Sequence, residues 1–176
     1  MATWNSRGLR GSVLEDLLNM TNQKYREKHL ALVQKIPTPI KPMKKEGGQI
    51  TLAYFEQDST VDYIGVAQGV PICFDAKECS KDTFSLQNIH EHQFEFMKEF
   101  MEHDGVAFII LMFSHRNETY YIPFSDIDRF VRRSKEGGRK SFRYDEIDKS
   151  YRIESRGGFL IHYLEQLNKN LRSLDG

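Results

Sequence analysis

Two aspartates and a lysine in the first half of this sequence have the types and spacing needed for metal-assisted chemistry. Asp62 and Asp75 are followed by Lys77, in the pattern Asp-x₁₂-Asp-x-Lys. Carboxylate oxygens are ligands that Mg²⁺ prefers, and a bound divalent metal can polarise a phosphoryl group and activate water. A lysine beside them can orient that water or stabilise developing charge. The three residues therefore predict phosphodiester hydrolysis, if the fold brings them together.

A β-hairpin would bring the two aspartates face to face. The segments on either side of Gln68-Gly69 read as its strands, and a symmetric turn places Asp62 opposite Asp75. Opposed side chains have Cβ atoms about 4.5–5.5 Å apart, where like charges repel unless they share a proton or a cation. Alternation puts Lys77 on the face of Asp75. The alternative is an ordinary surface hairpin with an Asp–Lys pair, because the spacing by itself is common by chance.

The rest of the chain predicts helices and strands that would hold this hairpin in a mixed α/β domain. Pro37-Thr38-Pro39 indicates extended chain, and we interpret the basic segment 44–48 as a turn. The segments are a helix over 13–28 capped by Ser12, a strand over 49–55, a helix late in 85–104 ended by Gly105, strands over 106–113 and 119–122, a short helix capped by Ser125, a basic loop over 134–141, and a C-terminal helix from Leu160 to Leu171.

Charge is balanced overall but unevenly distributed. The 176 residues contain 25 basic and 25 acidic side chains, yet segments 24–45 and 129–143 each hold seven basic residues and one acid, a net +6. Such segregation can build a face that contacts phosphates. The alternative is a solvated surface with scattered charge.

The composition is that of an ordinary globular domain. The longest apolar run, residues 106–113, is shorter than the roughly 20 residues that span a bilayer. Cys73 and Cys79 do not form a disulfide framework, and the first residues have no signal-peptide core. We therefore expect a single cytoplasmic domain over residues 1–176, with no membrane partner.

Around the Asp–Asp–Lys pattern, the sequence resembles the RecU family of Holliday-junction resolvases, within the PD-(D/E)XK nucleases. The resembling stretches run in order from about residue 10 to 165. They are 10–19 with Thr21-Asn22, 35–40, 53–55, 59–66, 74–78, 90–93 and 137–141.

This resemblance implies a restriction-endonuclease-like fold, with a mixed central sheet flanked by helices and a protruding basic β-stalk at about 36–53. It also implies a homodimer that cleaves four-way junction DNA with Mg²⁺, for which Mn²⁺ can substitute. Recombination proteins are possible further partners. Asp75 stands where the family usually has Glu, and Val61 where it tends to have Thr. A different nuclease of the same fold, or a non-catalytic junction-binding accessory protein, remain alternatives. The complete Asp62, Asp75 and Lys77 set favours an enzyme.

The same resemblance assigns roles to individual residues. Asp62, Asp75 and Lys77 would be catalytic, with Glu15 as a further acid from the first helix; Asp62, Asp75 and Glu15 would bind the metal. Glu15 has an alternative role, since at the third helical position it could complete a capping box with Ser12.

Further residues would support the site or bind DNA. Gln93 would support the active site. The expected DNA-binding residues are Arg10, Lys41, Lys44, Lys45, Arg139 and Lys140. For the last two the alternative is a mobile surface loop. His90 and His92 do not share a helix face, so capping or surface roles are favoured over metal binding.

Overall fold

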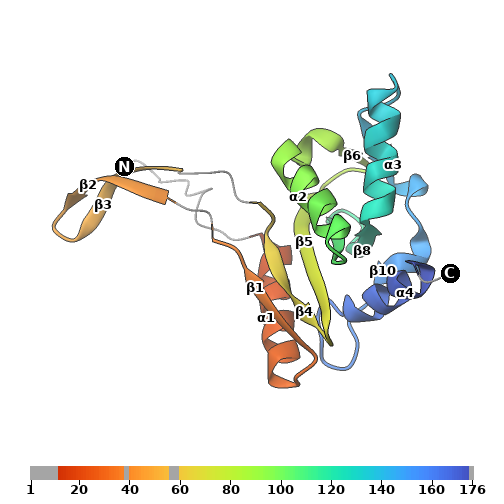
Figure 1. Ribbon diagram of the computed structural model, residues 1–176, viewed down its shortest axis with the longest axis horizontal. Helices are drawn as coiled ribbons and strands as arrows, with labels where there is room; N and C mark the ends of the chain where they lie inside the picture. Colours follow the sequence, from red (N-terminus) through yellow and green to blue (C-terminus); the bar gives the residue numbers. More distant parts are fainter. Residues whose placement is uncertain (1–11, 38–39, 56–59, 175–176) are drawn as a thin grey trace.

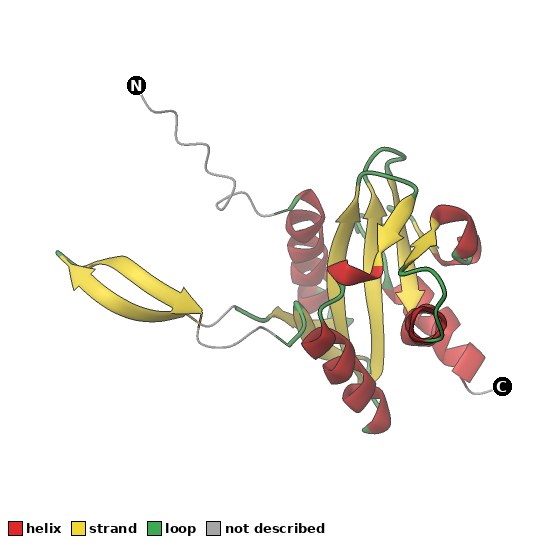
Figure 2. Ribbon diagram, turned by 90° about the horizontal axis from the view of Figure 1, so that it is seen from above, coloured by secondary structure: helices red, strands yellow, loops and turns green. Residues whose placement is uncertain are grey.

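The computed structural model describes residues 12–37, 40–55 and 60–174. Its centre is a mixed sheet of six strands, whose arrangement can be followed in Figures 1 and 2. The strand order is β1-β4-β5-β7-β8-β10, and only β5 and β7 run parallel. The strands are β1 (Ala31–Lys35), β4 (Tyr63–Ala67), β5 (Val70–Cys79), β7 (Val106–Phe113), β8 (Glu118–Pro123) and β10 (Arg152–Ile153). The expected mixed α/β architecture is thereby confirmed.

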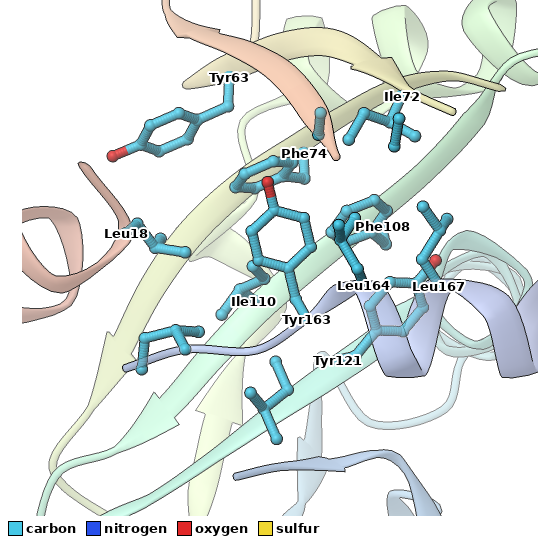
Figure 3. Packing of buried hydrophobic residues seen from close by; sticks show 14 of the residues in the cluster. Leu18, Tyr63, Ile72, Phe74, Phe108, Ile110, Tyr121, Tyr163, Leu164 and Leu167 are labelled. Atoms are coloured by element: carbon cyan, nitrogen blue, oxygen red, sulfur yellow. The ribbon is translucent and has the colours of Figure 1, made fainter. Parts of the chain in front are cut away.

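Helices cover both faces of this sheet because its central strand β7 is apolar on both sides. Phe108 and Ile110 pack in one cluster with residues of α1 (Val13–Glu27) and α4 (Leu164–Leu174). Ile109 packs in the other, with α2 (Glu91–Glu102) and α3 (Phe124–Lys135). Figure 3 shows Phe108 in the first cluster, where it stacks on Tyr121 with ring centroids 4.2 Å apart.

Helix α1 begins and packs as the sequence indicates. Ser12 Oγ accepts a hydrogen bond of 3.1 Å from the Glu15 N–H, which satisfies one of the amides left free at a helix start. Leu14, Leu18 and Tyr25 lie along one face and are fully buried against the sheet. Each such side chain contributes about 1.5–3 kcal/mol through removal from water.

The hairpin of β4 and β5 has the predicted register. Ala67 pairs with Val70 and Tyr63 with Phe74, so the residues of the two strands face each other symmetrically about the turn at Gln68-Gly69. The turn needs positive φ at both of its central residues, and Gln68 (51°) and Gly69 (89°) adopt it.

A second hairpin projects from the body of the molecule (Figure 1). It consists of β2 (Ile40–Glu46) and β3 (Gln49–Phe55), joined at Gly47-Gly48, and we call it the stalk. The expected basic protruding hairpin is confirmed. Lys44 and Lys45 belong to strand β2 and not to the turn, and their pairing with β3 is irregular.

Several predicted boundaries were wrong. Asp104, with φ of 61°, takes the left-handed conformation after α2 that was expected of Gly105. Gly105 is instead required for space, because a Cβ there would lie 2.3 Å from the Phe100 ring. Helix α3 has Pro123 and not Ser125 at its N-cap, and it extends to Lys135 into the expected basic loop.

Other features were not predicted. Strands β6 (Thr83–Ser85) and β9 (Ser141–Arg143) form a small separate sheet. Short 3-10 helices occur at Leu86–Asn88, Tyr144–Glu146 and Lys149–Tyr151. The C-terminal helix begins only at Leu164. Among the described helices, none has the length and apolar character needed to cross a membrane.

Candidate active site

The two aspartates lie face to face, and the backbone amides of Asp62 and Ala76 hold the two carboxylates in place. The Asp62 N–H donates a hydrogen bond of 2.9 Å to Asp75 Oδ1, and the Ala76 N–H donates one of 2.8 Å to Asp62 Oδ2. Asp62 lies at the entry to β4 and Asp75 lies within β5, as the hairpin register requires. The predicted juxtaposition of the two carboxylates is therefore present in the structure.

Lys77 reaches the same site from the same strand face as Asp75. Its Nζ lies 2.8 Å from Asp75 Oδ2 and donates a hydrogen bond of 3.1 Å to Gln93 Oε1. Gln93 is buried in the first turn of α2, and its Oε1 also accepts the His90 N–H at 3.2 Å. Helix α2 thus fixes the lysine through Gln93, which gives a geometric basis for the supporting role expected of this residue.

The site carries unbalanced negative charge. Asp75 is fully buried, and its Oδ2 has the Lys77 cation nearby but no directed hydrogen bond among the described residues. Burial, and then the charge of Asp75, raise the pKa of Asp62 to about 6. Both observations show carboxylates whose charge the protein leaves incompletely neutralised, which is the environment that a hard divalent cation would stabilise.

Glu15 lies apart from this pair. Its carboxylate forms an ion pair with Lys35 at the end of β1. In the described part of the chain no three Asp, Glu, His or Cys side chains gather closely enough to hold a metal. Glu15 is therefore not in a common ligand set with the two aspartates here, although its charge contributes to the raised pKa of Asp62. Asp62 and Asp75 present the carboxylate oxygens that a divalent cation prefers, and the metal-binding and catalytic roles expected of Glu15 stay predictions.

Lys35 pairs with the candidate site residue Glu15, a contact that sequence reasoning missed. It pairs in register with Tyr63, and the next residue, Ile36, donates its N–H to the Asp62 carbonyl at 2.8 Å. Lys35 also lines a groove of about 1140 Å³ along α1 and β1. It opens one of the stretches that resemble the RecU family, but a single lysine in a strand has no spacing that distinguishes it.

The candidate DNA-binding residues are spread over the molecule. Arg10 lies outside the described residues, whereas Lys41, Lys44 and Lys45 are all in strand β2 of the stalk. Arg139 forms an ion pair with Glu146 at 3.1 Å, while Lys140 is exposed in the following loop.

The remaining residues that the sequence singled out lie at a helix cap or in the core. His90 is the N-cap residue of α2, and its ring stacks on that of His92 with centroids 5.5 Å apart. Cys73 is fully buried in the core beneath α2 and α3, as expected of a packing residue. Val61 is also fully buried in that core.

The mixed sheet, the facing Asp62–Asp75 pair and Lys77 define the class of protein, that of the PD-(D/E)XK arrangement. Within this class the chain belongs to the RecU family. The model of that family, "Recombination protein U", matches residues 9–169. The resemblance noted in the sequence is thereby confirmed.

Curated relatives agree with this assignment. The Holliday junction resolvase RecU of Bacillus cytotoxicus is 42% identical over 156 residues, covering 85% of this chain and 78% of the relative. The protein of the same name from Lactococcus lactis is 41% identical over 169 residues, covering 92% and 78%. Among solved structures, Hjc, a Holliday junction resolvase of Archaeoglobus fulgidus, covers 64% of this chain with 10% identity and a TM-score of 0.38, a likeness too slight to support an assignment.

Proposed function

We propose that this protein is a structure-selective DNA endonuclease that resolves four-way (Holliday) junctions by metal-dependent phosphodiester hydrolysis. The observation that carries the proposal is the facing Asp62–Asp75 pair with Lys77 beside it, in a chain of the RecU family. Two carboxylates with an incompletely neutralised charge suit Mg²⁺, and Mn²⁺ would substitute because it prefers the same oxygen ligands.

Each residue has a role that follows from its position. A bound divalent cation would supply Lewis-acid polarisation of the phosphoryl oxygen and a water of lowered pKa. Asp62 and Asp75 hold the cation. The Lys77 ammonium, fixed by Gln93, orients the attacking water or stabilises charge that develops on the phosphate. Lys35 forms an ion pair with Glu15, and the next residue, Ile36, donates its N–H to the Asp62 carbonyl.

The substrate and the reaction also suggest an assembly. A four-way junction has approximate two-fold symmetry, and paired nicks require two active sites, which a homodimer provides. The stalk, with Lys41, Lys44 and Lys45, would contact phosphates near the junction. Arg10, Arg139 and Lys140 would contact the arms. Action on recombining DNA agrees with the cytoplasmic location expected from the sequence, and other recombination proteins are further candidate partners.

Two other functions fit parts of the structure. Another PD-(D/E)XK nuclease would share the site but would cut duplex DNA. A non-catalytic accessory protein would bind junctions without cutting them. The similarity to proteins named Holliday junction resolvases favours a junction over linear duplex as substrate, and the complete Asp62, Asp75 and Lys77 set favours an enzyme.

The test is cleavage of an immobile and a mobile four-way junction, beside matched linear duplex, with Mg²⁺ and with EDTA. We expect paired, metal-dependent nicks confined to the junction. Equal cutting of the linear duplex would favour a general nuclease. Tight junction binding with no cutting in Mg²⁺ or Mn²⁺ would exclude the enzyme and leave the accessory protein.

A further inference from the structure

A long-range hydrogen bond joins helix α1 to the catalytic strand β5. The Leu14 N–H, in the first turn of α1, donates to Glu78 Oε1 at 2.8 Å. The two residues are 64 positions apart in the chain. Because this contact involves the residue that follows Lys77, it connects α1 to the strand segment that carries the proposed active site.

This contact satisfies a physical need of the helix. The first amides of an α-helix have no partner within the helix, and an acidic side chain near its start also interacts favourably with the helix dipole. Ser12 accepts one of these amides, that of Glu15. Glu78 accepts another and does so as a carboxylate, whose hydrogen bonds are stronger than those of neutral acceptors.

Strand β5 therefore contacts helices through side chains on both of its faces. Alternation sends Lys77 to the side of α2, where it contacts Gln93, and Glu78 to the side of α1. A second tie lies further along the helix, where the Tyr63 hydroxyl donates to Asn19 Oδ1 at 3.1 Å. Since Tyr63 follows Asp62, both ties connect α1 to the hairpin that holds the two aspartates.

Glu15, the residue after Leu14, is the one whose position depends most directly on the first tie. Its carboxylate meets Lys35, and Ile36, the residue after Lys35, donates its N–H to the Asp62 carbonyl. Displacement of the first turn of α1 would therefore move the Glu15–Lys35 ion pair relative to Asp62.

We propose that Glu78 is a positioning residue for the active site. By fixing the first turn of α1, it holds the Glu15–Lys35 ion pair in place at the end of β1, next to the contact of Ile36 with the Asp62 carbonyl, and thereby sets the affinity for the metal and the rate of cleavage. This inference rests on the proposed nuclease function.

The first test compares Glu78→Ala and Glu78→Gln with the wild-type protein. Glu78→Ala should bind Mg²⁺ or Mn²⁺, measured by calorimetry without DNA, about tenfold more weakly, and should cleave junctions at least about tenfold more slowly at limiting metal. Glu78→Gln keeps an oxygen acceptor and should recover most of both. Junction affinity in EDTA should stay unchanged in each variant.

A control and a substitute variant keep this test decisive. Asp148→Ala removes another carboxylate that accepts a backbone amide, that of Ser150, and should leave metal affinity and cleavage at wild-type values. If Glu78→Ala fails to unfold cooperatively, Glu78→Asp supplies the comparison, because its shorter side chain cannot reach Leu14 in the same geometry.

The second test asks whether Glu78 acts through Glu15. In the double variant Glu15→Ala/Glu78→Ala, the effects on metal affinity should be less than additive, because removal of Glu15 leaves little for Glu78 to position. Additive effects, or normal metal affinity in Glu78→Ala, would overturn the inference while wild-type cleavage stands. Absence of cleavage by the wild-type protein would instead count against the proposed function, and the metal titrations would still decide the role of Glu78.

Discussion

At the scale of single residues, Asp75 occupies a position where the family usually has the longer acid Glu, and its carboxylate contacts both Asp62 and Lys77. Its Oδ1 accepts the Asp62 N–H, so the carboxylate is held by the backbone of the facing strand. Its other oxygen faces the Lys77 ammonium. One methylene fewer therefore leaves the carboxylate in contact with both of its neighbours.

Asp75 and Lys77 should be needed for cleavage and not for junction binding. Asp75→Ala would remove a proposed metal ligand, and Lys77→Ala would remove the charge proposed to stabilise the reacting phosphate, so each should lower the cleavage rate by at least about 100-fold. Rates under single-turnover conditions, and junction affinity in EDTA, would measure the two effects separately. Lys98→Ala, which alters an exposed lysine of α2, is the control. A variant that cuts at the wild-type rate would contradict the assigned roles.

The raised pKa of Asp62 predicts a pH dependence of stability in the metal-free protein. Between an ordinary carboxyl pKa of about 4 and its native pKa of about 6, Asp62 stays protonated in the native state but not in the unfolded chain. The native state then binds more protons, so the free energy of unfolding falls as pH rises through this window, by at most about 3 kcal/mol.

Urea unfolding in EDTA from pH 4 to 7 would measure this effect. The wild-type protein should lose stability relative to Asp62→Asn, which cannot titrate at this position. Mg²⁺ added at pH 7 should then stabilise the wild-type protein alone, because the cation binds the native carboxylates. Parallel stability curves for the two proteins would show that Asp62 titrates normally.

At the scale of elements, the close approach of β1 to β4 positions Lys35. A Cβ on Gly65 would lie 2.3 Å from the Leu32 carbonyl oxygen, so this contact between the strands requires glycine. The same strand pair places Lys35 opposite Tyr63. A backbone requirement in the middle of β4 thus determines where the cation at the end of β1 lies.

The stalk is the element whose charge should govern binding. Replacement of Lys41, Lys44 and Lys45 by Ala should weaken junction affinity at least about tenfold. It should also reduce the slope of log affinity against log salt by roughly 2–3, since each phosphate contact contributes about 0.9. Fluorescence anisotropy with a labelled junction over a salt series would measure both.

A charge-matched control separates contact from net charge. Lys98, Lys169 and Arg172, in α2 and α4, supply three cations away from the stalk. Their combined replacement should leave the salt slope close to the wild-type value. The same slope in both triple variants would contradict a specific role for the stalk.

At the scale of the whole molecule, the net charge is zero, but the basic residues are concentrated in two segments of the chain. One basic segment includes strand β2 of the stalk, and the other covers the end of α3 and the loop to β9. Many arginines of the second segment are already paired with acids, among them Arg133 and Arg139 with Glu146. These acids would compete with phosphates for the arginines of the second segment.

The proposed homodimer predicts a solution mass of twice the 20.6 kDa of one chain. Light scattering over a concentration series, with and without junction DNA, would measure it. Mixed dimers of wild-type and Asp75→Ala chains should make one nick per junction, because each active site cuts one strand. A monomeric protein that still makes paired nicks would refute this assembly.

The sequence alone determined the parts of the site that depend on local chain geometry. The turn at Gln68-Gly69 and the alternation of strand residues were enough to predict that Asp62 faces Asp75 and that Lys77 shares the face of Asp75. A two-residue turn sets the register of its own hairpin, so no distant contact was needed.

Only the tertiary structure decided which elements complete the site. The ion pair of Glu15 with Lys35 depends on α1 packing beside β1, and the contact of Lys77 with Gln93 depends on α2 covering the other face. The bond from Leu14 to Glu78 likewise joins elements far apart in the chain. Hydrophobic periodicity indicates that a helix has a buried face but not which strand it will cover, because that choice depends on the packing of the whole core.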